Sequence, residues 1–353
     1  MTIGEEEKMG YLALTIFFAF MGGLVLHKLR IPGGMMLGSV LTVAILNINT
    51  DFIYIPSEFR FVAQCIAGAY IGMSVKRENF HRMKDLIRPI GALLMGLFVT
   101  NLVVGILIYL TSPLDLLTSF LSAVPGGIGD TPLIAEDMGA DTAKVTVLQF
   151  VRLVSGIAVV PLLIKAEPIE KTSMEKKPSL VIRKESPFGN LKLWFALIVA
   201  FLAGYLGDIL GVPAGTLIFA MVSIVLLKIF KLEVTFPLWF KRLAQLFSGA
   251  YIGSHFSYQD FADLKLLIAP AIIMVALNIL TCYYIGHLLS RKYNLPLSQA
   301  ILSSSPAGAS DMALIASDLG VSGSDVAMIQ IARLIGAVTI FPQIFYLISK
   351  LLT

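Results

Sequence analysis

Long apolar stretches, each about the length of a membrane-spanning helix, alternate along this chain with short polar segments. A helix needs about 20 mostly apolar residues to cross the roughly 30 Å hydrocarbon core of a bilayer. The stretches predict transmembrane helices near residues 11–27, 31–48, 58–75, 90–111, 143–164, 192–210, 215–231, 239–256, 267–289 and 324–347. The pattern therefore predicts an all-α polytopic membrane protein with about ten spans.

The composition agrees with a membrane location. Apolar residues make up 57% of the chain and charged residues 14%, whereas soluble domains contain about 25% charged residues. The chain therefore has too few charges to cover a surface that faces water. The acidic start, Glu5 to Glu7, lacks the basic segment of a cleavable signal peptide, so we expect none.

The chain repeats itself at an offset of 181 residues: Gly-Ala-Tyr-Ile-Gly occupies 68–72 and recurs at 249–253. The same offset relates further positions, among them Pro32 and Pro213, Gly34 and Gly215, Gln64 and Gln245, Pro125 and Pro306, and Pro161 and Pro342. In a membrane protein, such duplication is typical of a transporter with its binding site at the repeat interface. We predict a first transmembrane repeat at 1–165, a linker at 166–189 and a second repeat at 190–353.

Basic residues are distributed unevenly between alternate loops. With the N-terminus outside and five spans per repeat, 20 of the 27 Lys and Arg fall in inner segments and five in outer ones. This bias follows the positive-inside rule and places the linker in the cytoplasm. The basic loop at 76–84 corresponds in the repeat to the acidic stretch 257–263. Equivalent loops of opposite charge predict that the two repeats are inverted.

A short interrupted segment precedes the last span of each repeat, at 121–139 and at 302–320. Each has a short apolar helix, a Pro-x-Gly break and a second helix, and neither helix alone is long enough to span. We predict a re-entrant hairpin or broken helix whose tip is buried in protein or lines a cavity. Small tip residues such as Gly126, Gly127 and Gly308 allow a ligand to approach the backbone closely. The second helix presents its N-terminal N–H groups there, which favours an anion.

Asp130 and Asp311 stand at the start of these second helices and allow two interpretations. Aspartate is a favoured N-cap residue, so capping alone could explain both. Alternatively, they couple transport to a cation or proton, because an ionisable group deep in a membrane is costly and usually functional.

Arg152 and Arg333 lie within the following spans, each three residues after a glutamine, Gln149 or Gln330. This spacing places each Gln and Arg on one helix face. One interpretation is a structural salt bridge from each Arg to the tip Asp of its own repeat. In the other, the two guanidinium groups bind an anionic substrate such as a carboxylate. Hydroxyl groups at the tips, including that of Ser305, could bind a ligand or satisfy local backbone.

Other polar and small residues favour structural roles. Glu136, Asp137 and Asp318 lie near the hairpin ends, where we expect them to be solvated. The Gly-Ala-Tyr-Ile-Gly segments fit helix packing through small residues. Cys65 and Cys282 are not repeat equivalents, so free buried thiols are favoured over a disulfide. The four histidines do not approach metal-ligand spacing, and no nucleophile and base are paired, so we expect neither a metal nor an enzyme.

The paired motifs Pro-Gly-Gly-x-x-Asp at 125–130 and Pro-Ala-Gly-x-x-Asp at 306–311, each followed by Gln-x-x-Arg, resemble the AbrB family of bacterial membrane proteins. The resemblance covers nearly the whole chain and implies a multi-pass protein of the bacterial inner membrane. Family labels include "ammonia monooxygenase" and "regulator of gene expression". The chain has no metal-ligand cluster for the first activity and no DNA-binding segment for the second, so an effect on expression would be indirect. Gly129-Asp130-Thr131 departs from the pattern expected at a tip, which leaves open whether the two tips share one role.

These features predict a secondary transporter that carries a small organic anion by alternating access, with Na⁺ or H⁺ as candidate coupling ions. The predicted substrate-binding residues are Gly126, Gly127, Gln149, Arg152, Ser305, Gly308, Gln330 and Arg333, and the predicted ion-coupling residues are Asp130 and Asp311. No cofactor, metal or nucleic acid is expected, and a homo-oligomer remains open. The alternative is a membrane-embedded sensor or regulator, although residues 166–189 are short for a soluble output domain.

Overall fold

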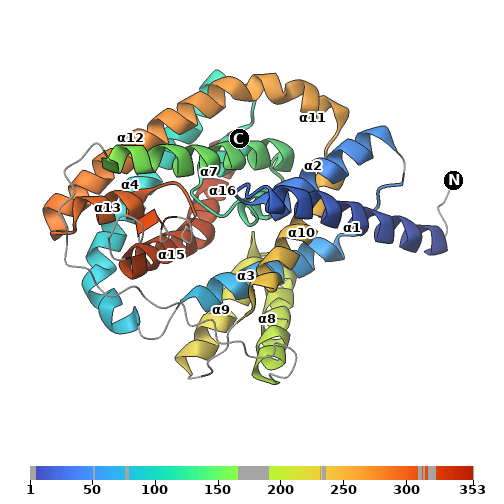
Figure 1. Cartoon of the computed structure of the whole chain (residues 1–353), viewed down its shortest axis with the longest axis horizontal. Coiled ribbons are helices and arrows are strands. Elements are labelled where there is room, and N and C mark those ends of the chain that lie inside the picture. Colours follow the sequence, from blue (N-terminus) through green and yellow to red (C-terminus); the bar gives the residue numbers. More distant parts are fainter. Residues whose placement is uncertain are drawn as a thin grey trace. The chain divides into compact units, whose positions relative to one another are not determined.

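The computed structural model describes most of the chain, and every element in the described residues is a helix (Figure 1). The described residues are 5–50, 52–75, 79–165, 191–230, 232, 236–308, 312, 315–316 and 323–352. The linker at 166–189, Asp311 and Asp318 lie outside them.

Helices occupy all the predicted apolar stretches of both repeats. The first repeat contains α1 (Glu5–Lys28), α2 (Gly34–Asn49), α3 (Glu58–Ser74), α4 (Asn79–Thr111), α5 (Leu116–Ala123), α6 (Thr131–Asp137) and α7 (Thr142–Lys165). The second contains α8 (Leu191–Ile209), α9 (Gly215–Ile229), α10 (Leu238–Ser254), α11 (Tyr258–Asp263), a 3₁₀ turn (Leu264–Leu267), α12 (Ile268–Tyr293), α13 (Leu297–Ser304), α15 (Gly323–Thr339) and α16 (Phe341–Leu352). The helical prediction for these stretches is confirmed.

Six helical segments of the described chain are long and apolar enough to cross a membrane. They are Glu6–Lys28, Leu86–Thr111, Thr142–Ile164, Leu191–Ile209, Tyr258–Tyr293 and Asp325–Leu352, and Gly34–Asn49 and Gly215–Ile229 are shorter apolar helices. Large apolar side chains such as Leu110 and Leu202 are strongly exposed, as expected where hydrocarbon covers the surface. The chain thus has the features of a helical membrane protein, and the count of ten spans stays a prediction.

The helices form two compact units, and each unit takes helices from both repeats. The first unit comprises Met1–Ser74, Ile128–Thr146 and Pro187–Lys265, and the second comprises Val75–Gly127, Val147–Ser186 and Leu266–Thr353. The chain passes from the second unit to the first inside the Pro-Gly-Gly break, after Gly127, and returns within α7, after Thr146. The predicted boundaries follow the repeats in the sequence, whereas the compact units cut across them.

In the first unit, the Gly-Ala-Tyr-Ile-Gly segments pack helices from the two repeats against each other. A Cβ atom on Gly68 of α3 would lie 2.3 Å from the carbonyl oxygen of Leu217 in α9. A Cβ atom on Gly249 of α10 would lie 2.6 Å from the carbonyl oxygen of Met36 in α2. The two contacts are repeat equivalents with exchanged partners, as expected for two copies related by an approximate two-fold axis. The packing interpretation of the segments is therefore confirmed.

In the second unit, α4 and α12 meet at a pair of threonines that are repeat equivalents. The Thr281 hydroxyl donates to Thr100 Oγ1 at 3.1 Å across a sequence separation of 181. This contact therefore joins the two repeats at equivalent positions of their sequences. The apolar core of this unit includes Phe120, whose ring stacks on Phe345 with centroids 4.7 Å apart.

Candidate functional site

The predicted breaks are present in the structure. Helices α5 and α13 have 8 residues each, which at 1.5 Å per residue is about 12 Å and far short of a bilayer core. Asp115 caps α5 by accepting the backbone N–H of Thr118 at 2.9 Å. After the first break, the 7-residue α6 begins at Thr131 and ends in a Schellman motif around Gly139, where φ is +75°. Most of the second arm of the other repeat lies outside the described residues.

Gln149 and Gln330 cap the C-terminal ends of these short helices with hydrogen bonds to their last carbonyl groups. Gln149 Nε2 donates to the carbonyl oxygens of Leu121, Ser122 and Val124 at 3.1, 3.2 and 2.9 Å. Gln330 Nε2 makes the equivalent bonds in the second repeat, to the Leu302 and Ser305 carbonyls at 2.6 and 3.4 Å. The last carbonyls of a helix have no intrahelical partner, and without water in hydrocarbon each costs several kcal/mol if unpaired. The glutamine amides therefore allow helices to end inside the unit.

Arg152 lies 2% exposed between the two breaks of the second unit. Its Nη2 donates to the Gly126 carbonyl at 2.6 Å and its Nη1 to the Pro306 carbonyl at 2.7 Å. Its Nε and Nη2 also donate to Gln149 Oε1, at 3.1 and 2.7 Å. One side chain thus joins the Pro-Gly-Gly break of the first repeat to the Pro-Ala-Gly break of the second.

Arg333, 3% exposed, binds the second break from the other span. Its Nη2 donates to the Ala307 carbonyl at 2.8 Å, and its Nη1 donates to the Ser305 carbonyl. Because Arg152 takes the Pro306 carbonyl between them, both guanidinium groups converge on three consecutive carbonyl groups. The second break is therefore the place where two buried positive charges meet.

The second unit supplies backbone dipoles for these two charges but no counter-ion in its described residues. The described residues place no carboxylate within ion-pair distance of Arg152 or Arg333, whereas Arg60 and Lys144, both in the first unit, have carboxylate partners. Asp130 also belongs to the first unit, so the predicted salt bridge from Arg152 to Asp130 stays a prediction. A buried charge is costly unless it is paired. A site with two such charges favours an anionic ligand.

The remaining predicted binding residues are placed as follows. The Ser305 carbonyl accepts hydrogen bonds from Arg333 and Gln330. The Ser305 hydroxyl accepts the backbone N–H of Ala307 at 3.3 Å. Gly126 contributes its carbonyl to Arg152. Gly127 and Gly308 are partly exposed, and the Gly308 carbonyl accepts the N–H of Met312 at 3.0 Å. The structure thus brings Gln149, Arg152, Gly126, Ser305, Gln330 and Arg333 together in one hydrogen-bonded cluster.

Asp130 directly precedes α6, as predicted, but its carboxylate makes no capping hydrogen bond. Capping therefore does not explain this aspartate, which removes one of its two interpretations. The hydroxyl of the neighbouring Thr131 is buried and has no partner. Asp311 lies outside the described residues, so its role stays a prediction.

A polar cluster in the first unit was not recognised from the sequence. Arg60 Nη1 lies 3.2 Å from Asp137 Oδ1, and Gln64 Nε2 donates to Asp137 Oδ2 at 2.7 Å. The neighbouring Glu136 accepts the Thr142 hydroxyl at 2.7 Å. The Asp137 side chain is only 14% exposed, so the expectation of a solvated carboxylate is wrong for Asp137, whereas Glu136 is partly exposed. Arg60 and Gln64 of α3 hold Asp137 at the end of α6, and Thr142 at the start of α7 holds Glu136.

The sequence did contain a signal for this cluster. Arg60 and Lys241 are repeat equivalents, and each stands four residues before an equivalent glutamine, Gln64 or Gln245. That spacing places both side chains on one helix face. The arginine also lies 6.0 Å from the ring centre of Tyr251, and Lys241 lies 5.8 Å from that of the equivalent Tyr70. A basic residue present in both repeats near the end of a span could have predicted an ion pair with a carboxylate at the end of the hairpin.

Replacing Asp137 by asparagine should lower the free energy of unfolding by about 1 kcal/mol, since the pair with Arg60 is partly exposed and screened. Thermal unfolding of the purified protein in detergent measures the change. Asp263→Asn is a matched control, because Asp263 reaches Lys144 only at 3.9 Å, and it should leave stability unchanged. Equal effects of the two substitutions would contradict a role of Asp137 in holding α6.

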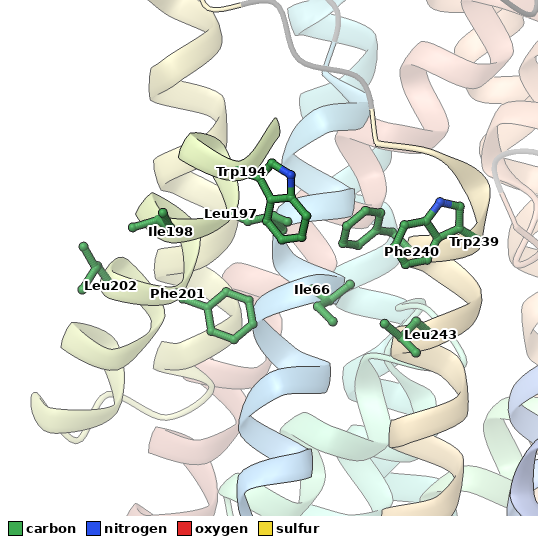
Figure 2. A pocket seen from close by; sticks show the side chains of 9 residues that line it. All are labelled: Ile66, Trp194, Leu197, Ile198, Phe201, Leu202, Trp239, Phe240 and Leu243. Carbon is green, nitrogen blue, oxygen red and sulfur yellow. The ribbon is translucent and has the colours of Figure 1, made fainter. Parts of the chain in front are cut away.

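The first unit also has an apolar groove with a volume of about 470 Å³ between α3, α8 and α10. Figure 2 shows its lining side chains, which include both tryptophans of the chain. They are Ile66, Trp194, Leu197, Ile198, Phe201, Leu202, Trp239, Phe240 and Leu243. This lining has no charged residue and none of the predicted binding residues, so the groove does not fit a small anion.

The helices and the buried arginine cluster define a polytopic helical membrane protein with an internal, positively charged site. Comparison with known families identifies it further. The family described as "Transition state regulatory protein AbrB" matches residues 1–167 and, a second time, residues 53–349. The chain therefore belongs to the AbrB family, as its motifs indicated.

Two relatives match nearly the whole chain. The "Uncharacterized protein YhjN" of Bacillus subtilis (strain 168) is 23% identical over 349 residues, covering 94% of this chain and 91% of that protein. The "Putative regulator AbrB" of Escherichia coli (strain K12) is 24% identical over 346 residues, covering 96% of each. The similarity thus extends over both repeats.

Proposed function

We propose that this protein is a secondary transporter that carries a small organic anion by alternating access. The observation that carries the proposal is the convergence of Arg152 and Arg333 on the carbonyls of Ser305, Pro306 and Ala307. Broken helices with ligand sites at the repeat interface are typical of secondary transporters. A buried site with two arginines suits the binding and release of an anion, and the protein is proposed not to be an enzyme.

The duplicated architecture supports alternating access. Contacts that exchange partners at an offset of 181 residues, together with the opposite charge of equivalent loops, favour two inverted five-span repeats. Alternating access requires two bodies that move against each other, and the chain has two compact units. We place the protein in the bacterial inner membrane with ten spans, the N-terminus outside and the linker in the cytoplasm.

Asp130 and Asp311 are the proposed coupling residues for Na⁺ or H⁺. Asp130 makes no capping bond with α6, which leaves its carboxylate available for a cation. An ionisable residue within a membrane is a functional candidate by default. Replacing either aspartate should uncouple uptake from the ion gradient.

A second candidate is a membrane-embedded sensor that regulates gene expression indirectly. It is favoured by the name of the Escherichia coli relative, "Putative regulator AbrB". A sensor would use the same arginine site for a ligand but would move none of it across the membrane.

Uptake into proteoliposomes separates the two candidates. Purified protein in vesicles should accumulate a radiolabelled small carboxylate when a Na⁺ or H⁺ gradient is imposed, and uptake should saturate and cease when the gradient is dissipated. Protein-free vesicles provide the baseline. Binding of a carboxylate without any flux, under both gradients and in both directions, would refute the transporter and favour the sensor.

A further inference from the structure

Arg152 with Gln149 and Arg333 with Gln330 are repeat equivalents in the second unit, yet the two pairs differ in their hydrogen bonds. In the first repeat, Arg152 Nε donates to Gln149 Oε1 at 3.1 Å. In the second, the equivalent Arg333 Nε and Gln330 Oε1 are both buried and have no hydrogen-bond partner. The hydrogen bond between arginine Nε and glutamine Oε1 is therefore present in the first repeat and absent from the second.

The helix that precedes each break differs in the same way. The Ser122 hydroxyl of α5 donates to the Thr118 carbonyl at 2.7 Å. Its repeat equivalent in α13, Ser303, is fully buried, and its hydroxyl has no partner. Three equivalent polar atoms are thus satisfied in the first repeat and unsatisfied in the second.

These unsatisfied groups belong to one neighbourhood. Gln330 and Arg333 both donate to the Ser305 carbonyl, and Gln330 also donates to the Leu302 carbonyl, next to Ser303, at 2.6 Å. Buried polar groups nearly always have a partner, and an exception calls for an explanation such as a ligand. All three are at least nine-tenths buried, so bulk water does not satisfy them.

We propose that the second break alone holds the substrate directly and that the substrate is a small hydroxycarboxylate. Arg333 Nε–H donates to a carboxylate oxygen, and Gln330 Oε1 accepts the hydroxyl of the substrate. The Ser303 hydroxyl, which can donate and accept, completes the set. Arg152, whose donors are taken by carbonyls and by Gln149, positions the break and adds positive charge. The proposal deepens the proposed function, since it names the substrate class of the same site.

The positive charge of the site favours a substrate that carries a hydroxyl group, rather than an ammonium group, next to its carboxylate. Gln330 Oε1 needs a donor, and both groups could supply one. Two buried guanidinium groups bind the same three carbonyls from Ser305 to Ala307, and a third positive charge would be repelled by both. A neutral hydroxyl satisfies the acceptor without this cost.

Binding to the full-length protein in detergent tests the substrate class without requiring transport. The probes are two matched pairs that differ by one hydroxyl group, L-lactate against propionate and L-malate against succinate, with L-alanine for the ammonium group. The hydroxy acid of each pair should bind at least about tenfold more tightly, because its analogue leaves a buried acceptor unpaired. L-alanine should bind more weakly than L-lactate.

Matched variants locate the site in one repeat. Ser303→Ala should weaken L-lactate binding severalfold without lowering thermal stability, whereas Ser122→Ala should leave the affinity unchanged. Arg333→Lys keeps the charge but removes the Nε–H donor, and it should reduce binding of the hydroxy acids at least about tenfold. Arg152→Lys should lower thermal stability while the preference for the hydroxy acid persists.

Equal affinities within each pair, or no binding of any probe at millimolar concentration, would overturn the assignment of the substrate class. Equal effects of Ser303→Ala and Ser122→Ala would overturn the assignment to the second repeat. Failure of the transporter proposal is recognised separately, since hydroxy acids that bind with these preferences but produce no flux would leave this inference intact.

Discussion

Arg333→Gln should abolish uptake of the transported anion while leaving the protein folded in the membrane. The substitution removes a buried charge and its donors to the Ser305 and Ala307 carbonyls. Loss of a buried, hydrogen-bonded charge partner costs about 2–5 kcal/mol, and at about 1.4 kcal/mol per factor of ten the rate should fall about 30-fold or more.

Arg152→Gln should also stop uptake, with a larger loss of stability. Its guanidinium joins Gly126 in one break to Pro306 in the other, so the substitution leaves two buried carbonyls without donors. Each unpaired buried acceptor costs about 1–3 kcal/mol. Arg333→Gln leaves only the Ala307 carbonyl without a donor, because the Ser305 carbonyl keeps Gln330. The thermal midpoint should therefore fall more for Arg152→Gln than for Arg333→Gln, although both proteins should remain inserted.

Initial rates of uptake in proteoliposomes, normalised to inserted protein, measure both effects. Size-exclusion chromatography in detergent shows whether each variant is folded. Arg291→Gln is the control, since this exposed residue in the last turn of α12 lies outside the cluster. Wild-type uptake by both Arg152→Gln and Arg333→Gln would refute the assignment of the binding site.

The elements of this fold could be predicted because their signals are local. The apolar stretches have the length of helices, and the Pro-x-Gly sequence after Leu121 and after Leu302 forces each short helix to stop. The small residues at Gly68 and Gly249 also indicated close helix packing, which the contacts with α9 and α2 confirm. Helix periods and breakers depend on neighbouring residues, so one sequence suffices to find them.

The partners of the polar side chains were harder to predict, because they depend on contacts between distant segments. The spacing of Gln149 and Arg152 placed them on one helix face, but it could not show that the glutamine closes α5 or that the arginine reaches Pro306. The pairing of Arg60 with Asp137 was missed for the same reason. The division into units that mix the repeats likewise depends on which helices pair in space.

The difference in hydrogen bonding between the two arginine sites could not be predicted from the sequence either. Gln-x-x-Arg occurs in both repeats and predicts the same local geometry. The segments before the two breaks differ in sequence, since Ala123 and Val124 of the first repeat correspond to Ser304 and Ser305 of the second. Which polar atoms stay unpaired depends on the packing of the whole break, which one sequence does not reveal.

Gly68→Leu and Gly249→Leu should each prevent stable folding of the first unit. The first carbon of the new side chain would meet a backbone oxygen at 2.3 Å for Gly68 and 2.6 Å for Gly249. Backbone oxygens of α9 and α2 cannot rotate away as a side chain can, so the helices must separate. Extra methylene groups in a packed core cost about 1–3 kcal/mol, and a leucine at a backbone contact should exceed that range.

The yield of monodisperse protein and its thermal midpoint in detergent measure this effect. Gly91→Leu is the matched control, because Gly91 also lies within a helix, α4, but a Cβ atom there has no neighbour within 4 Å. It should leave stability unchanged or raise it by about 0.5–1 kcal/mol, since glycine is unfavourable within a helix. Because Gly68 and Gly249 make repeat-equivalent contacts, their leucine variants should lose a similar amount of stability. A stable Gly249→Leu protein would contradict the close contact between α10 and α2 on which the fold of the first unit depends.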